Sequence, residues 1–190
     1  MRNRNSTECC KRPMRPKKIF FHKTYSEETT LDLGRALGAA LTPGVTVLLS
    51  GDLGTGKTTL VRGIGDALGV TRVRSPSFTL VNEYRTGTAS FSIVHADLYR
   101  LKPGEVEYLG LEEYHETPCV LLVEWPERWT EPPERGVLKI FIEAKGENER
   151  AFGITSTGGL ADLVLQNLQE AVIKEDGKID PGVGLQPALD

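Results

Sequence analysis

The sequence contains few cysteines and no long apolar run, and each absence excludes a class of protein. Its three cysteines, Cys9, Cys10 and Cys119, predict neither a disulfide framework nor a zinc-binding spacing, and this usage fits a reducing cytosol. The longest apolar runs, such as VTVLL and CVLLV, are far shorter than the roughly 18 residues that a membrane-spanning helix needs. We therefore expect a cytoplasmic protein that does not cross a membrane.

The chain also lacks an excess of positive charge. Its formal net charge is -3 and its pI is near 5.7, which argues against nucleic-acid binding over the whole surface. Any contact with RNA would be local or made through a partner. The exception is residues 1–18, which contain one acidic residue, Glu8, and a larger set of basic residues: Arg2, Arg4, Lys11, Arg12, Arg15, Lys17 and Lys18. We expect a disordered arm here, because like charges without apolar residues cannot repay the entropy of ordering; an arm that touches RNA or serves in targeting is the alternative.

Length and composition predict one folded domain. A chain of 190 residues with 39% hydrophobic composition can bury one substantial core, whereas two halves would each be marginal. We expect this domain to span residues 19–173, between the arm and a flexible C-terminal tail at residues 174–190 that is rich in glycine and proline.

The first half of the domain predicts a helix, a buried strand and a second helix. Thr24 or Ser26 can cap a helix whose leucines recur at near-helical spacing up to residue 41. The run from Val45 to Leu49 is continuously apolar, which is typical of a strand buried on both faces. The apolar residues of segment 60–68 fall on one helical face, and Gly69 suits the left-handed position that ends a helix.

The second half predicts the remainder of a sheet. Segments 77–84 and 91–99 are typical of antiparallel strands joined by a turn across residues 86–88, and segment 119–125 is another continuous apolar strand. A short helix is expected from near Pro103 to residue 114, a second hairpin over residues 137–156 and a closing helix over residues 159–173. We predict an α/β fold in which a parallel central sheet is flanked by antiparallel strands.

The stretch SGDLGTGKTTLVRG at residues 50–63 follows the first buried strand and completes the pattern G-x-x-x-x-G-K-[ST]. Glycines let consecutive backbone N–H groups surround a phosphate, the lysine brings charge to the β- and γ-phosphates, and the threonine hydroxyl can bind Mg²⁺. The following helix directs its N-terminus at the same anion. We therefore predict a single P-loop NTPase domain rather than an ordinary glycine-rich turn. Its nucleotide-binding residues are Gly51, Asp52, Leu53, Gly54, Thr55, Gly56, Lys57, Thr58 and Thr59.

Two acidic residues stand where apolar strands end. Asp97 closes FSIVHAD and Glu124 closes CVLLVE, so either one can act as the carboxylate that positions Mg²⁺ and the attacking water. Taken alone, each could equally be a solvated residue at the end of a strand. Two such residues at matching positions favour a catalytic role for Asp97 and Glu124.

The nucleotide is predicted to be ATP. A GTPase is expected to carry an [NT]-K-x-D motif, and the nearest stretch, GKID at residues 177–180, has the wrong first residue and lies in the tail. A small-molecule kinase is the alternative, because Arg72 and Arg74 could belong to an arginine-rich lid that excludes water. A binding module without catalytic activity is the third hypothesis.

Five motifs of the chain resemble the TsaE family in order and spacing: GDLGTGKTTLVRG, SPSFTLVNEY, HADLYRL, GLEEY and LVEWPER. The resemblance covers about residues 24–156. It implies a compact P-loop ATPase of bacterial tRNA threonylcarbamoyladenosine synthesis that acts with two partner proteins, TsaB and TsaD. It also implies that ATP hydrolysis supports modification of adenosine 37 in tRNAs that read codons beginning with A. We expect hydrolysis by the isolated chain to be weak. The transfer chemistry belongs to TsaD, so tRNA is met through the complex.

The resemblance also assigns roles to residues. It implies that Lys57 and Thr58 bind phosphate and Mg²⁺, that Glu124 is the acid on the metal side, and that Asp97 lies near the attacking water. Residues 75–77 resemble a switch-like loop, in which Ser77 stands where many relatives have threonine.

Four further residues each have two interpretations. Trp125 either lies near the nucleotide or the partner, or caps the core at the end of a strand. His95 either orients Asp97 or relays a proton, or makes a structural hydrogen bond. Arg100 and Arg128 either steady transition-state charge or form surface ion pairs.

Overall fold

The computed structural model describes residues 19–102, 104–134 and 136–176. The predicted arm at residues 1–18 and residues 177–190 of the predicted tail lie outside the described residues. None of the helices in the described ranges is both long and apolar enough to span a membrane.

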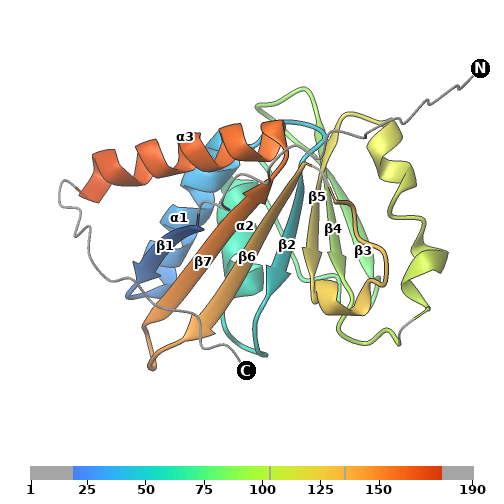
Figure 1. Ribbon diagram of the computed structural model, residues 1–190, viewed down its shortest axis with the longest axis horizontal. Coiled ribbons are helices and arrows are strands. Elements are labelled where there is room, and N and C mark those ends of the chain that lie inside the picture. Colours follow the sequence, from blue (N-terminus) through green and yellow to red (C-terminus); the bar gives the residue numbers. More distant parts are fainter. Residues whose placement is uncertain (1–18, 103, 135, 177–190) are drawn as a thin grey trace, which may run out of the picture.

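Seven strands form one mixed sheet in the order β1-β7-β6-β2-β5-β4-β3 (Figure 1). The strands are β1 Ile19–Thr24, β2 Thr46–Ser50, β3 Val81–Arg85, β4 Ser92–Asp97, β5 Cys119–Glu124, β6 Val137–Ala144 and β7 Arg150–Thr157. The pairs β6-β2, β2-β5 and β5-β4 are parallel, whereas β1-β7, β7-β6 and β4-β3 are antiparallel. The predicted parallel centre with antiparallel flanks is therefore confirmed.

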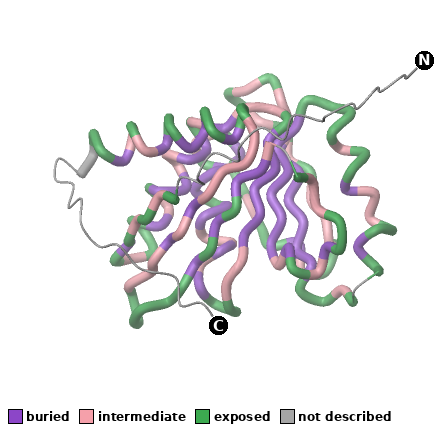
Figure 2. The backbone as a smooth tube through the Cα atoms, viewed as in Figure 1, coloured by how far each residue is buried: buried purple, intermediate pink, exposed green. Residues whose placement is uncertain are grey.

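Helices cover one face of this sheet. They are α1 Glu27–Ala40, α2 Lys57–Ala67 and α3 Gly159–Asp176, and apolar residues of all three share one core cluster with the strands. A second cluster lies on the other face, where Leu98, Val106, Leu111 and Trp129 pack on the central strands. Successive side chains of β5 point to opposite faces of the sheet, so the strand contributes residues to both clusters. Figure 2 shows the buried backbone running through these central strands. Burial on both faces explains the continuous apolar runs of β2 and β5.

The α1 helix begins at a capping box and packs unusually close to α2. The Ser26 side chain accepts a hydrogen bond from the Thr29 N–H, and the Thr29 hydroxyl accepts one from the Ser26 N–H. A Cβ on Gly34 would lie 2.5 Å from the Leu60 carbonyl oxygen, and one on Gly63 would lie 2.3 Å from the Leu31 carbonyl oxygen. Backbone contact of this kind needs glycine on both helices, and it fixes α2 against α1.

Three local predictions differ from the structure. Strand β3 begins only at Val81, because Leu80 has a left-handed backbone with φ 66° that ends the preceding turn. The single helix expected near Pro103 is instead two 3₁₀ helices, Val106–Leu109 and Glu113–Glu116, because Gly110 is left-handed between them. Helix α3 continues to Asp176, past the boundary expected before residue 174.

Candidate functional site

The glycine-rich loop connects β2 to α2 at the carboxyl end of the parallel strands. Gly51 has φ 141°, and a Cβ there would meet the Ile142 carbonyl oxygen at 2.3 Å. Gly56 is left-handed and precedes α2 without any side-chain cap. The first N–H groups of α2 therefore remain available to an anion, as the strand, loop and helix pattern predicts.

Lys57, the first residue of α2, is almost completely buried, with 4% of its surface exposed. Its Nζ donates hydrogen bonds to the carbonyl oxygens of Gly51 at 2.7 Å and Asp52 at 2.8 Å. The same nitrogen lies 4.1 Å from the centre of the Trp125 ring, a cation-π contact. Burial lowers the pKa of Lys57, and nearby carboxylates, Glu124 first among them, oppose that shift.

Thr58 and Glu124 are in direct contact. The Thr58 hydroxyl lies 2.9 Å from Glu124 Oε1 and 3.2 Å from Oε2, although the two residues come from α2 and the end of β5. Glu124 is 3% exposed, and its Oε1 also lies 2.9 Å from His95 Nε2. The predicted metal-binding pair is thus brought together, and His95 contacts Glu124 rather than Asp97.

Asp97 occupies the position next to Glu124 in the sheet, because the two residues pair in the register of β4 and β5. Its Oδ2 accepts hydrogen bonds from the hydroxyls of Ser75 at 3.1 Å and Ser77 at 3.2 Å, and its Oδ1 accepts one from the Tyr99 N–H at 3.1 Å. The carboxylate of Asp97 therefore anchors the segment that contains residues 75–77. Ser77 supplies one of the two hydroxyl groups in this contact.

Trp125, at the end of β5, is partly buried against the core and also contacts Lys57. It packs against the second core cluster, and its ring contacts Lys57 and lies 4.8 Å, centroid to centroid, from the ring of Tyr99. Its φ of 60° is left-handed, which turns the chain sharply at the end of β5. This turn places the indole ring beside the phosphate loop.

The candidate arginines have different surroundings. Arg100 stacks on the ring of Phe78 at 4.6 Å, and Phe78 is 87% exposed. Arg128 ends the short 3₁₀ helix Pro126–Arg128 that follows Trp125. Arg72 and Arg74 are exposed, and the contacts recorded for Arg74 involve its backbone and the Tyr84 hydroxyl. An arginine-rich lid is therefore not visible in the described residues.

Sequence reasoning missed Arg150, the first residue of β7. Its Nε donates to the Thr55 carbonyl oxygen of the phosphate loop at 3.1 Å. Its Nη1 donates to the carbonyl oxygens of Gly146, Glu147 and Glu149 at 3.0 to 3.1 Å. Arg150 thus ties the phosphate loop to the turn between β6 and β7. No spacing in the sequence indicates this contact, because 95 positions separate the two residues.

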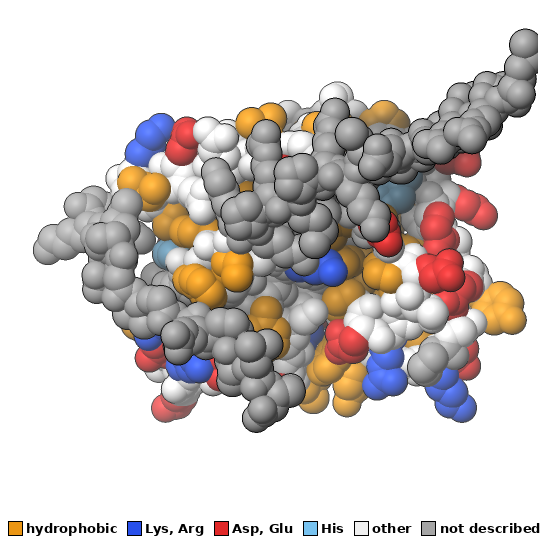
Figure 3. Space-filling view, in the orientation of Figure 1, with side chains coloured by type: hydrophobic (Ala, Val, Ile, Leu, Met, Phe, Trp, Pro, Cys, Tyr) orange, Lys and Arg blue, Asp and Glu red, His pale blue; other side chains and the backbone are white. Residues whose placement is uncertain are grey.

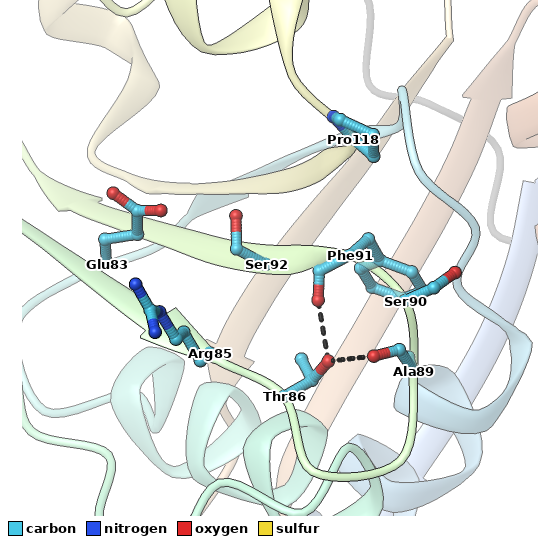
Figure 4. Close-up of a pocket in the computed structure, with 8 residues that line it drawn as sticks. All are labelled: Glu83, Arg85, Thr86, Ala89, Ser90, Phe91, Ser92 and Pro118. Carbon is cyan, nitrogen blue, oxygen red and sulfur yellow. Dashed lines mark hydrogen bonds between the residues drawn. The ribbon is translucent and has the colours of Figure 1, made fainter.

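A pocket of about 260 Å³ borders the phosphate loop. Its walls include the start of α1 (Ser26, Glu27, Thr30), two loop glycines (Gly54, Gly56) and Asn148 of the β6-β7 turn. A cavity of about 320 Å³ lies elsewhere, between the β3-β4 connection and Pro118 (Figure 4). There the Thr86 hydroxyl donates to the carbonyl oxygens of Ala89 and Phe91. This second cavity borders the starts of β4 and β5, so it lies at the opposite end of the parallel strands from the phosphate loop.

The residues at the phosphate loop suit Mg²⁺ bound together with a nucleotide. The described part of the chain contains no group of three or more His, Cys, Asp or Glu side chains that could hold a metal by themselves. Mg²⁺ typically takes one or two protein oxygens and completes its shell with phosphate and water. The Thr58 hydroxyl and the Glu124 carboxylate supply that number of oxygens at the start of α2.

Comparison with known proteins identifies the family. The sequence model described as Threonylcarbamoyl adenosine biosynthesis protein TsaE matches residues 24–152. The chain belongs to the TsaE family. Among relatives named tRNA threonylcarbamoyladenosine biosynthesis protein TsaE, the protein of Nostoc sp. is 44% identical over 134 residues, which cover 68% of this chain and 81% of the relative. The protein of that name in Bacillus subtilis is 37% identical over 147 residues, covering 77% and 91%.

A solved structure agrees with this assignment. The crystal structure of Bacillus subtilis YdiB matches with a TM-score of 0.71 at 31% identity, and the match covers 83% of this chain and 99% of YdiB. The TsaE match includes Lys57, Thr58, Asp97, Glu124 and Arg150. All the residues that form the site therefore lie within the family region.

Proposed function

We propose that this TsaE-family chain binds and hydrolyses ATP with Mg²⁺, and that this activity supports threonylcarbamoyladenosine formation at position 37 of tRNAs reading codons beginning with A. TsaB and TsaD are the proposed partners. The names of the relatives support the pathway. The observation that carries the ATPase proposal is the contact between Thr58 and Glu124 at the start of α2, beside a loop shaped for phosphate.

The phosphate-binding residues act through charge and through free N–H groups. Lys57 directs an ammonium group into the loop, held by two carbonyl oxygens and the Trp125 ring. The uncapped start of α2 adds N–H donors and partial positive charge. Thr58 and Glu124 would hold Mg²⁺, which when bound neutralises charge on the β- and γ-phosphates.

Asp97 is proposed to orient the attacking water. Its carboxylate already accepts three hydrogen bonds and therefore has a fixed orientation beside Glu124. Two of these bonds come from Ser75 and Ser77, so a change at Asp97 is transmitted to the segment around residues 75–80. We propose that ATP and Mg²⁺ order this segment, that the ordered form docks on TsaD, and that hydrolysis resets it.

The nucleoside is proposed to lie in the pocket of about 260 Å³ beside the loop. This pocket adjoins Gly54 and Gly56 and is lined by hydroxyl, amide and carboxylate groups from α1 and the β6-β7 turn. Such groups can accept and donate hydrogen bonds to a base and a ribose. The second cavity is too far along the strands to receive a nucleoside whose phosphates occupy the loop.

Hydrolysis by the isolated chain is expected to be weak. A catalytic arginine typically steadies the transition-state charge in P-loop enzymes. Arg100 is stacked on Phe78 in this structure, and Arg150 donates to backbone carbonyls. We propose that a partner surface completes the site, which would make the rate depend on the complex.

The test is phosphate release from ATP by the purified chain, alone and with TsaB, TsaD and tRNA. We expect a rate that rises with the partners and is lost in Lys57→Ala, Asp97→Ala and Glu124→Ala. Partners without effect, together with acceleration by a small hydroxylated metabolite, would favour a kinase. If Asp97→Ala and Glu124→Ala still support tRNA modification, the chain is a binding module without catalytic activity.

A further inference from the structure

His95 is a fully buried polar side chain at the edge of the phosphate site. It lies in β4 with 0% of its surface exposed, and its side chain projects from the same side of the strand as that of Asp97. The His95 Nε2 atom is 2.9 Å from Glu124 Oε1. This contact crosses from β4 to the end of β5, where Glu124 meets Thr58.

The donor in this contact is Nε2 of the imidazole ring. An ionised carboxylate oxygen only accepts hydrogen bonds, so the hydrogen must lie on the nitrogen. The other ring nitrogen, Nδ1, is buried and has no hydrogen-bond partner among the described residues. Placing the hydrogen on Nε2 satisfies the carboxylate and spares the ring an unpaired buried N–H.

Burial of this ring is poorly explained by stability alone. Its neighbours in β4, Ile93, Val94 and Ala96, are buried apolar residues, and an apolar side chain at position 95 would leave no orphaned nitrogen in the core. Within the described part of the chain, the hydrogen bond that the ring makes is the one to Glu124. The position therefore serves the carboxylate.

Glu124 is held from two sides by this arrangement. Thr58 approaches from α2 and His95 from β4, and both contact Oε1 at 2.9 Å. The two donors fix the rotation of the carboxylate, whose terminal torsion is otherwise broad. A carboxylate without the His95 donor could turn away from the hydroxyl at the start of α2.

We propose that His95 is a positioning residue for the Mg²⁺ site. Its Nε2–H holds the Glu124 carboxylate toward Thr58, and this makes nucleotide binding responsive to Mg²⁺. The inference rests on the proposed ATP and Mg²⁺ binding. It predicts that His95 affects the Mg²⁺ response and leaves phosphate contacts by Lys57 and the loop N–H groups intact.

The matched variants are His95→Gln and His95→Asn. Both place a primary amide in the strand, but only the longer glutamine carries its N–H₂ group as far as the position of Nε2. The affinity of the full-length chain for a fluorescent non-hydrolysable ATP analogue is measured across a Mg²⁺ titration and in EDTA. We expect His95→Gln to resemble the wild type and His95→Asn to need roughly 10- to 100-fold more Mg²⁺ for the same gain in affinity. Binding in EDTA should be equal in all three proteins.

A residue that only stabilises the core would lower the melting temperature of both variants without changing the Mg²⁺ response. An unchanged Mg²⁺ titration in His95→Asn would therefore overturn the inference while leaving the proposed function intact. A wild-type chain that binds no nucleotide in any Mg²⁺ concentration would overturn both. Should His95→Asn fail to fold, His95→Leu fills the site with an apolar side chain that cannot donate, and the same loss of Mg²⁺ response is expected.

Discussion

Asp97 and Glu124 pair directly across β4 and β5, yet their carboxylates accept hydrogen bonds from different parts of the chain. Glu124 contacts Thr58 and His95, whereas Asp97 contacts Ser75, Ser77 and the Tyr99 backbone. Neighbouring carboxylates with separate partners can carry separate tasks. The structure associates Glu124 with the start of α2 and Asp97 with the segment around residues 75–80.

This division predicts different kinetic losses for two conservative variants. Glu124→Gln should raise the Mg²⁺ concentration needed for ATP hydrolysis by roughly 10- to 100-fold, because an amide is a poorer Mg²⁺ ligand. Asp97→Asn should lower turnover by roughly 100-fold or more at every Mg²⁺ concentration, because the amide cannot take up a proton from water. The measurement is the ATPase rate of the assembled complex as Mg²⁺ is varied.

Glu127→Gln is the control for these two variants. Glu127 is an exposed acidic residue whose charge raises the pKa of Lys57. Glu127→Gln should change neither the Mg²⁺ concentration needed for ATP hydrolysis nor the turnover appreciably. Identical losses in Glu124→Gln and Asp97→Asn would contradict separate tasks.

Nucleotide affinity is expected to fall as the pH rises into the alkaline range. Burial places the pKa of Lys57 below its ordinary value in the free protein, and bound phosphates would raise it again. Above the lowered pKa, binding must take up a proton, so affinity declines with pH. Isothermal titration with ADP across the alkaline range measures this decline.

The lowered pKa of Lys57 has the opposite effect on the stability of the nucleotide-free protein, whose free energy of unfolding gains from a rise in pH. Since the unfolded chain binds more protons between the lowered pKa and the ordinary one, the contribution of Lys57 to the free energy of unfolding rises with pH in that window. Lys57→Met, of similar length and without charge, should bind weakly at all pH values and lose the pH-dependent decline. A wild-type affinity that stays constant until an ordinary lysine titrates would count against this account.

Arg150 is predicted to support nucleotide binding through the shape of the phosphate loop. Arg150→Gln removes charged donors to Thr55 and to three carbonyl oxygens of the β6-β7 turn. A charge-assisted hydrogen bond contributes about 1.5 to 3 kcal/mol, so loss of the one to Thr55 should weaken ATP binding by roughly 10- to 100-fold. Equilibrium binding of a fluorescent ATP analogue checks this value.

Lys23→Gln provides a matched control on the same turn. Lys23 Nζ contacts Glu149 Oε1 at 2.8 Å; Lys23 is exposed and Glu149 is half-buried, and this ion pair does not include a residue of the loop. Its loss should change stability little, because exposed ion pairs are screened by solvent, and should leave nucleotide affinity unchanged. Equal effects of the two variants would mean that the turn, and not the bond to Thr55, supports binding.

The contact between α1 and α2 predicts a position that tolerates no side chain. Gly34→Ala would place a methyl group 2.5 Å from the Leu60 carbonyl oxygen, so the helices must separate. We expect about 1 to 3 kcal/mol lower free energy of unfolding by urea denaturation, despite the better helix propensity of alanine. Gly159→Ala, which meets nothing within 4 Å at the start of α3, should be neutral or stabilising. A stabilised Gly34→Ala would show that α1 shifts without cost.

The distribution of charge limits where a tRNA can lie. Figure 3 shows acidic side chains gathered on the side of the molecule formed by residues 104–117, and Glu105, Glu107, Glu112, Glu113 and Glu116 are all exposed there. Phosphate groups are repelled from such a surface. We therefore expect tRNA to avoid this surface, and contact with tRNA through partner proteins stays a prediction.

The sequence by itself determined the elements whose signals are local. A continuous apolar run before G-x-x-x-x-G-K-[ST] and an amphipathic stretch after it were enough to predict β2, the loop and α2. Asp97 and Glu124 were found because each closes an apolar strand, and the fold class followed from runs buried on both faces. Five motifs in order were enough to indicate the family.

Only the tertiary structure decided which of these residues touch. Strand β6 lies beside β2 although 91 positions separate the paired residues Ser50 and Phe141, and the same number separates Thr46 and Val137.

 Contacts over such distances depend on how the strands are ordered in the sheet, and local periodicity carries no information about that order.

The same physical reason applies to the site. Thr58 and Glu124 are 66 positions apart, His95 and Glu124 are 29 apart, and Arg150 and Thr55 are 95 apart. Each contact exists because parallel strands bring their carboxyl ends to one edge of the sheet, where α2 and the β6-β7 turn also meet. The residue types that could do the chemistry were readable in the sequence, and their pairing was decided by packing.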